Sequence, residues 1–168
     1  MFITCSYCKC YVRACDDFAS AYQCRMQSII LPDESATLAL GKSLIGHLSA
    51  GSVVALTGEL GAGKTTLVRG MLRAVLGDIE VPSPTFTLVQ TYELPDYEIW
   101  HCDMYRLERP EDGYELGLLD AFEEALCLIE WPDKIAPLLP KDILEVDIGF
   151  DGEGRVARLT GFGDIDFG

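Results

Sequence analysis

A glycine-rich segment that ends in Lys64 and Thr65 is the part of the chain best suited to chemistry. It reads Gly58-Glu-Leu-Gly-Ala-Gly-Lys64-Thr65 and matches the phosphate-binding pattern G-x-x-x-x-G-K-[ST] at every fixed position. The apolar residues 52–57 precede it as a predicted strand, and an amphipathic helix is predicted to begin near Thr65. In this setting, inward-pointing backbone N–H groups and the positive helix end would surround an anion. We therefore predict a nucleotide site in which Lys64 contacts the β- and γ-phosphates and the Thr65 hydroxyl contacts Mg²⁺.

A carboxylate, Glu130, follows the short apolar run of residues 125–129, which has the pattern of a strand buried on both faces. Ligands of open α/β sheets bind outside the carboxyl ends of the strands. Glu130 is therefore placed to hold Mg²⁺ directly or through water, although an ordinary solvated glutamate at a strand end is the alternative. The adjacent Trp131 would cover the nucleotide or a partner surface, or would pack against the strand end.

A second carboxylate, Asp103, lies in a segment whose side chains alternate between the two faces of a predicted strand. One face carries Ile99, His101, Asp103 and Tyr105, and the other, predicted to face the core, carries Trp100, Cys102 and Met104. Asp103 is the candidate to orient or activate the attacking water. His101 is either part of this site or a structural polar group. Arg106 would either stabilise charge in the site or pair with an acid, and pairing with an acid is the expectation.

A loop stiffened by proline, Ser83-Pro84-Thr85, follows the predicted phosphate-site helix. Hydroxyl groups in such a loop can sense the γ-phosphate and Mg²⁺, as switch segments of nucleotide-hydrolysing proteins do. Taken alone, the same residues would be an ordinary turn.

The elements expected to position these residues alternate between strands and helices. Strands are predicted at 27–31, 52–57, 86–94, 98–105, 125–129, 143–150 and 155–160, and helices from an N-cap at Pro32-Asp33 to Leu48, from Thr65 to Gly77, and over 111–124 with interruptions at Gly113 and Gly117. Parallel βα units beside two hairpins imply a mixed sheet. We predict an α/β fold, a P-loop NTPase-like three-layer architecture with a mixed parallel and antiparallel central sheet.

Composition limits the partners. A chain of 168 residues suits one domain with a sizeable core. Its net charge of −14 argues against direct binding to a nucleic-acid backbone, which needs clustered Lys and Arg, and favours a protein partner. No apolar run approaches the roughly 20 residues of a membrane span, so no membrane association is expected.

Cysteines divide the chain unevenly. Five of the seven cysteines lie in the first 24 residues: Cys5, Cys8, Cys10, Cys15 and Cys24. We interpret residues 1–25 as a Cys-rich extension outside the core, or as the result of a start codon assigned too far upstream. A single P-loop ATPase domain is expected over 26–168. A small metal site built on Cys5 and Cys8 is the alternative. Cys102 and Cys127 lie in apolar runs and are predicted to be buried thiols, which fits a reducing cytoplasm.

Four motifs together resemble a known family. They are Gly58-x-x-Gly61-Ala-Gly-Lys-Thr-Thr66, Ser83-Pro-Thr-Phe-Thr-Leu-Val89, His101-x-Asp103-x-Tyr105-Arg106 and Ile129-Glu-Trp131-Pro. In this order and spacing the chain resembles the TsaE (YjeE/YdiB) family of bacterial ATPases from about Met26 to the last hairpin. The segment from Pro32 to Gly41 also looks like the start of the family domain.

The resemblance implies a weak, Mg²⁺-dependent ATPase of the cytoplasm that is required to make N6-threonylcarbamoyladenosine at adenosine 37 of tRNA. It implies action on a heterodimer of TsaB and TsaD, which would hold the tRNA, so that contact with tRNA is only indirect. Carried over by motif, the catalytic residues are Lys64, Asp103 and Glu130, the Mg²⁺ ligands are Thr65 and Glu130, and the ATP-binding residues are Glu34, Gly61, Ala62, Gly63, Lys64, Thr65, Thr66, Thr85 and Trp131.

Two other functions stay open on the residues alone. A small-molecule kinase would need a lid with Arg or Lys that closes over both substrates, and the chain has no Arg-rich lid segment. A nucleotide-gated binding module without catalysis would not need the carboxylates Asp103 and Glu130.

Overall fold

The computed structural model describes residues 26–161, so the predicted extension at 1–25 and its cysteines lie outside the described residues. The elements are β1 (Gln27–Leu31), α1 (Glu34–Ile45), β2 (Val53–Thr57), α2 (Lys64–Leu76), β3 (Val89–Glu93), β4 (Glu98–Asp103), α3 (Asp112–Glu115), α4 (Leu118–Glu124), β5 (Leu126–Glu130), the 3-10 helix η1 (Pro132–Ile135), β6 (Leu144–Asp151) and β7 (Gly154–Thr160). Within this part of the chain, no helix is long and apolar enough to cross a membrane.

The strands form one seven-stranded sheet in the order β1-β7-β6-β2-β5-β4-β3. The central strands β6, β2, β5 and β4 are parallel to one another. Antiparallel pairs complete the two edges, β6–β7 and β7–β1 on one side and β4–β3 on the other. The predicted mixed sheet and both predicted hairpins are therefore confirmed.

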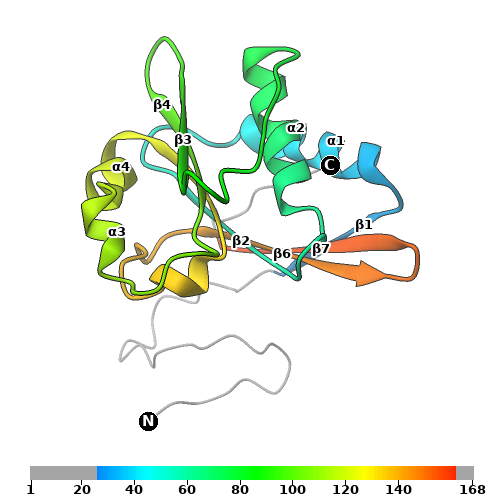
Figure 1. Cartoon of the computed structure of the whole chain (residues 1–168). Helices are drawn as coiled ribbons and strands as arrows, with labels where there is room; N and C mark the ends of the chain where they lie inside the picture. The colour runs from blue at the N-terminus through cyan, green and yellow to red at the C-terminus, as the bar shows by residue number, and fades with distance from the viewer. Residues whose placement is uncertain (1–25, 162–168) are drawn as a thin grey trace, which may run out of the picture.

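Helices cover both faces of the sheet, which gives three layers (Figure 1). Helices α1 and α2 pack on one face, where Leu44, Leu67 and Met71 meet the sheet residues Leu56 and Leu128. The other face packs against α4 and η1, through a second cluster that contains Leu118, Phe122, Ile129, Ile135 and Cys127. In β5, Leu128 belongs to the first of these clusters and its neighbours Cys127 and Ile129 belong to the second. The strand is therefore buried on both faces, as its apolar run predicts.

Two glycines set the close approach of α1 and α2. A Cβ atom on Gly41 would collide with the backbone carbonyl oxygen of Leu67, and one on Gly70 would collide with that of Leu38. The helices can therefore pack backbone against backbone only because both positions lack a side chain. This contact brings the first turn of α1, which Asp33 caps through its bond to the Ala36 N–H, beside the phosphate-binding segment.

Several predicted boundaries were wrong. Strand β4 ends at Asp103 rather than at residue 105. Helix α1 ends at Ile45 rather than Leu48. The strand predicted from residue 86 begins only at Val89, because Leu88 has a φ of 64° and donates its N–H to the Pro84 carbonyl in a turn. Gly113 lies inside α3 and does not interrupt it, whereas Gly117, with a φ of 77°, does separate α3 from α4.

Candidate nucleotide site

The predicted phosphate-binding segment is the loop between β2 and α2. It leaves the sheet after Thr57 and enters the helix at Lys64, so the strand–loop–helix setting predicted from the sequence is confirmed. Gly63, the N-cap of α2, has a φ of 111°, which a residue with a side chain rarely adopts. Gly58 has a φ of 131°, and a Cβ atom there would collide with the Ile148 carbonyl oxygen. The loop thus needs glycine at both ends.

Lys64 is held over this loop and is only 4% exposed. Its Nζ donates to the carbonyl oxygens of Gly58 at 2.7 Å and Glu59 at 2.9 Å, and it lies 4.1 Å from the ring centroid of Trp131. Burial lowers the pKa of the Lys64 ammonium, and the nearby carboxylates of Glu130 and Asp103 oppose that shift. An ammonium has three N–H donors, so two carbonyls leave one donor for an anion.

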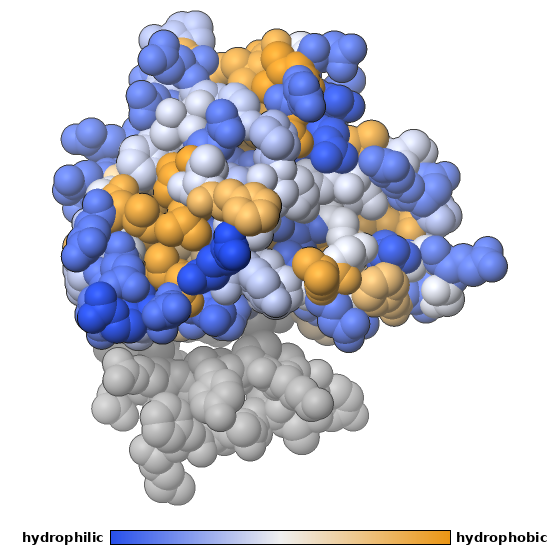
Figure 2. All heavy atoms as spheres, in the orientation of Figure 1, coloured by the Kyte–Doolittle hydropathy of each residue, from blue (hydrophilic) through white to orange (hydrophobic). Residues whose placement is uncertain are grey.

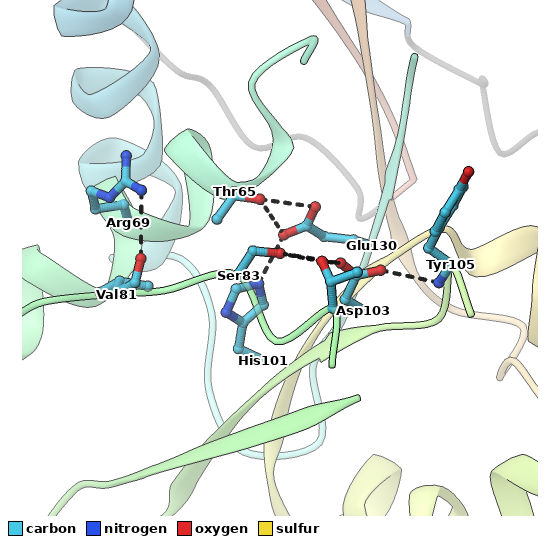
Figure 3. Close-up of polar contacts among 9 residues, drawn as sticks. Thr65, Arg69, Val81, Ser83, His101, Asp103, Tyr105 and Glu130 are labelled. Carbon is cyan, nitrogen blue, oxygen red and sulfur yellow. Dashed lines mark hydrogen bonds and ion pairs between the residues drawn. The ribbon is translucent and has the colours of Figure 1, made fainter. Parts of the chain in front are cut away.

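Glu130 ends β5 and is 3% exposed. Thr65 Oγ1, in the first turn of α2, donates to Glu130 at 2.8 Å from Oε1 and 3.1 Å from Oε2. His101 Nε2 lies 2.9 Å from the same Oε1 atom. Figure 3 shows the three side chains pointing toward one another from α2, β4 and β5. The two residues predicted as Mg²⁺ ligands, Thr65 and Glu130, are therefore in direct contact.

Asp103 ends β4 directly beside Glu130, because the two residues are register partners on parallel strands. Its Oδ2 atom accepts hydrogen bonds from Thr85 Oγ1 at 2.6 Å and Ser83 Oγ at 3.2 Å, while Oδ1 accepts from the Tyr105 N–H at 3.0 Å. The Ser83–Thr85 segment thus closes over Asp103, which is 3% exposed (Figure 3). The structure brings together the predicted catalytic carboxylate and the predicted switch-like loop.

Trp131 follows Glu130 in a left-handed conformation, with a φ of 60°. Its ring packs against that of Tyr105, with centroids 5.0 Å apart, and faces the Lys64 ammonium. Strained backbone of this kind is found most often at functional sites. Arg106 was expected to pair with an acid; its guanidinium instead lies over the Phe86 ring, at 4.7 Å from the centroid.

A pocket of about 290 Å³ opens on the α1 side of the loop. It is lined by the predicted ATP-binding residues Glu34, Gly61, Ala62, Gly63 and Thr66, and also by Thr37, Glu153 and Arg155. The sequence predicts the β6–β7 hairpin that carries Glu153 and Arg155, but no local pattern shows that β7 pairs with β1 and so brings the turn here. These two residues are the part of the site that sequence reasoning missed.

The donor set fits Mg²⁺, a hard cation that prefers oxygen ligands. A hydroxyl from Thr65 and a carboxylate from Glu130 meet at 2.8 Å. Across residues 26–161 no group of three or more His, Cys, Asp and Glu side chains could hold a metal by itself. Such a site suits a cation that takes its remaining ligands from nucleotide phosphates and water, as Mg²⁺ does in phosphate-loop proteins.

Comparison with known proteins agrees with this arrangement. The family model "Threonylcarbamoyl adenosine biosynthesis protein TsaE" matches residues 31–158. The chain belongs to the TsaE family. It is 41% identical over 133 residues to the tRNA threonylcarbamoyladenosine biosynthesis protein TsaE of Rickettsia bellii, covering 78% of this chain and 92% of that protein. It is 40% identical over 135 residues to the protein of the same name from Haemophilus influenzae, covering 77% of this chain and 85% of that protein.

A solved structure gives the same result for the fold. The crystal structure of Bacillus subtilis YdiB aligns with a TM-score of 0.72 and 27% sequence identity, over 86% of this chain and 90% of that one. The predicted P-loop fold and the TsaE resemblance are both confirmed.

Proposed function

We propose that the protein binds and hydrolyses ATP with Mg²⁺ and that its hydrolysis serves the threonylcarbamoylation of adenosine 37 in tRNA. The observation that supports hydrolysis is the meeting of four side chains beside the phosphate loop. Lys64, Thr65 and two carboxylates from adjacent parallel strands converge there, and each is almost fully or partly buried. A module that only bound nucleotide would not need the second carboxylate.

In this proposal the loop N–H groups and the remaining Lys64 N–H hold the phosphates. Thr65 and Glu130 hold Mg²⁺, which when bound neutralises charge on the phosphate oxygens. Asp103 orients or activates the attacking water. Its Oδ2 atom already accepts two hydroxyl hydrogen bonds, from Ser83 and Thr85, so water can bind there only after the Ser83–Thr85 segment releases the carboxylate. The hydroxyl of Thr85 is then free to contact the nucleotide.

The pocket of about 290 Å³ would receive the nucleoside, because it continues from the loop toward the first turn of α1. Glu34 and Thr66 line it together with Arg155 of the β6–β7 hairpin. Trp131, on the Lys64 side of the loop, would instead cover the phosphates.

We further propose that the working partner is a TsaB–TsaD heterodimer in the cytoplasm and that tRNA is contacted only through it. The relatives are named for tRNA threonylcarbamoyladenosine biosynthesis. A net charge of −14 disfavours a direct tRNA contact. Large apolar side chains are exposed next to the site, with Leu60 of the loop 79% and Phe86 84% exposed. Figure 2 shows several separate orange groups of apolar side chains on the viewed face.

The test is ATP hydrolysis in Mg²⁺ buffer by the protein alone and with added TsaB–TsaD. We expect slow turnover alone and a sharp rise with the partners. An unchanged rate with both partners present would contradict the partner-gated ATPase. Transfer of phosphate to a small acceptor instead of water would identify a kinase.

A further inference from the structure

His101 is the buried polar group that the proposed mechanism does not use. It lies on β4, is 0% exposed, and places Nε2 2.9 Å from Glu130 Oε1. Its Nδ1 atom is buried without a hydrogen-bond partner among the described residues. We propose that His101 is a positioning residue that fixes the Glu130 carboxylate for Mg²⁺, an inference that rests on the proposed function.

The hydrogen bond between His101 and Glu130 determines which nitrogen of the imidazole carries the proton. An ionised carboxylate only accepts hydrogen bonds, so Nε2 of His101 must carry the proton that it donates to Glu130. Nδ1 then carries a lone pair. A proton on Nδ1 as well would leave an unpaired N–H group in the interior, which is costly. The geometry therefore assigns the neutral tautomer with the proton on Nε2.

Two donors converge on one oxygen of Glu130. Oε1 accepts from His101 at 2.9 Å and from Thr65 at 2.8 Å, whereas Oε2 has only the longer Thr65 contact at 3.1 Å. A carboxylate oxygen that already accepts two short hydrogen bonds is a poor place for a cation. His101 thus directs Oε2, the less occupied oxygen, toward the metal.

The imidazole is rigidly placed for this task. His101 is the register partner of Leu128 on β5, and its ring reaches along that strand to Glu130, two residues further on. The residue is 0% exposed, and Ile99, on the same face of β4, belongs to the core cluster that includes residues of α2. Hydrogen-bonded groups behind metal ligands change metal affinity by about 10–100-fold when they are removed. A histidine that only filled space would have no such effect.

The experiment measures Mg²⁺ affinity without hydrolysis. Binding of mant-ADP, a fluorescent ADP, is followed during Mg²⁺ titration and, separately, in EDTA. For His101→Leu we expect the Mg²⁺ midpoint to rise about 10–100-fold while the mant-ADP affinity in EDTA is unchanged. His101→Gln, whose amide N–H lies near the position of Nε2, should restore most of the Mg²⁺ affinity. His101→Asn, whose amide is too short, should not, and Cys102→Ala on the opposite face of β4 is the matched control.

The possible outcomes separate the two proposals. If the wild-type protein binds mant-ADP with Mg²⁺ and His101→Leu has the same midpoint, or if Asn restores it as well as Gln, the positioning role is refuted and the ATP-binding function stands. If the wild-type protein shows no Mg²⁺-dependent nucleotide binding, the proposed function fails and the positioning role fails with it. Should the Leu variant not fold, the imidazole ¹⁵N spectrum of the wild-type protein decides. Protonated Nε2 with unprotonated Nδ1 supports the role, and the reverse tautomer overturns it.

Discussion

Replacing Glu130 by Gln separates the charge of this side chain from its shape. Glu130 and Asp103 are register partners on parallel strands, and neighbouring strands lie about 4.8 Å apart. At an effective dielectric constant of about 20, like charges at a separation of that order repel by about 3 kcal/mol. Both carboxylates also attract the Lys64 ammonium, Glu130 more than Asp103, which opposes the lowering of its pKa by burial. Glu130→Gln loses one repulsion and one attraction, so we expect the free energy of unfolding to change by less than about 1 kcal/mol.

Turnover should respond differently to the same change. The charge of Glu130 is what would hold Mg²⁺ against the phosphates, and losing one such electrostatic contact costs about 3 kcal/mol in the transition state, or about 100-fold in rate. Glu130→Ala should lose as much turnover. It should also lose about 2–4 kcal/mol of stability, because the donors on Thr65 and His101 are left without an acceptor.

The assays are phosphate release with Mg²⁺ and TsaB–TsaD, and urea denaturation of the protein alone. The reasoning is refuted if Glu130→Gln hydrolyses ATP at the wild-type rate. It is also refuted if Glu130→Gln and Glu130→Ala destabilise the fold equally, since the balance of charges would then not describe the site.

Three further predictions concern the rest of the chain. Asp103→Asn should lower turnover about 100-fold while leaving mant-ADP affinity with Mg²⁺ unchanged, because Asp103 is assigned to water rather than to nucleotide; weaker binding would instead make it a ligand. A chain that begins at Met26 should fold and bind ATP, as thermal melting and mant-ADP titration would show, and failure of either would place residues 1–25 in the domain. Cys127, whose pKa burial raises to about 12, should resist iodoacetamide at pH 8 in the folded protein, since the thiolate is the reactive form and forms only at much higher pH. Peptide mapping by mass spectrometry would detect modification of Cys127 under native conditions, which would contradict its burial.

The features predicted from the sequence are those that depend on interactions between residues close together in the chain. The loop, the capped start of α1 and the two hairpins depend on neighbours a few residues away, and all were predicted. Strand β3 begins only at Val89 because a turn precedes it. That turn depends on a hydrogen bond from the Leu88 N–H to the Pro84 carbonyl, which the amino-acid composition does not indicate. Helix α3 continues through Gly113 because the position is buried against α4 and η1, where a Cβ atom would meet Leu118 and Ile135. Tertiary packing outweighs the low helix propensity of glycine at that point.

The site residues also differ in whether local sequence or the whole sheet determines their position. Lys64 and Thr65 were found as one contiguous motif, and Glu130 as a carboxylate at the end of an apolar strand. Asp103 was found from the alternation of side chains in the strand predicted over 98–105. Only the order β2-β5-β4 makes the two carboxylates neighbours, and strand order is a property of the whole sheet. The contribution of Arg155 depends on β7 pairing with β1, which joins segments from opposite ends of the described chain.

Two similar pairs at adjacent strand ends connect nucleotide binding to the Ser83–Thr85 segment. Thr65 donates to Glu130 and Thr85 donates to Asp103. The Thr65 hydroxyl can keep its bond and still offer an oxygen lone pair to Mg²⁺, whereas the proposed mechanism needs the Thr85 hydroxyl elsewhere. Hydrogen bonds to charged groups contribute about 1.5–3 kcal/mol each, so releasing Thr85 from Asp103 has a substantial cost. Thr85 belongs to a loop next to the exposed Phe86 ring, and a protein that binds this surface would supply the energy to move the loop. This cost predicts that the protein alone is a weak ATPase and that partners which move the loop accelerate hydrolysis.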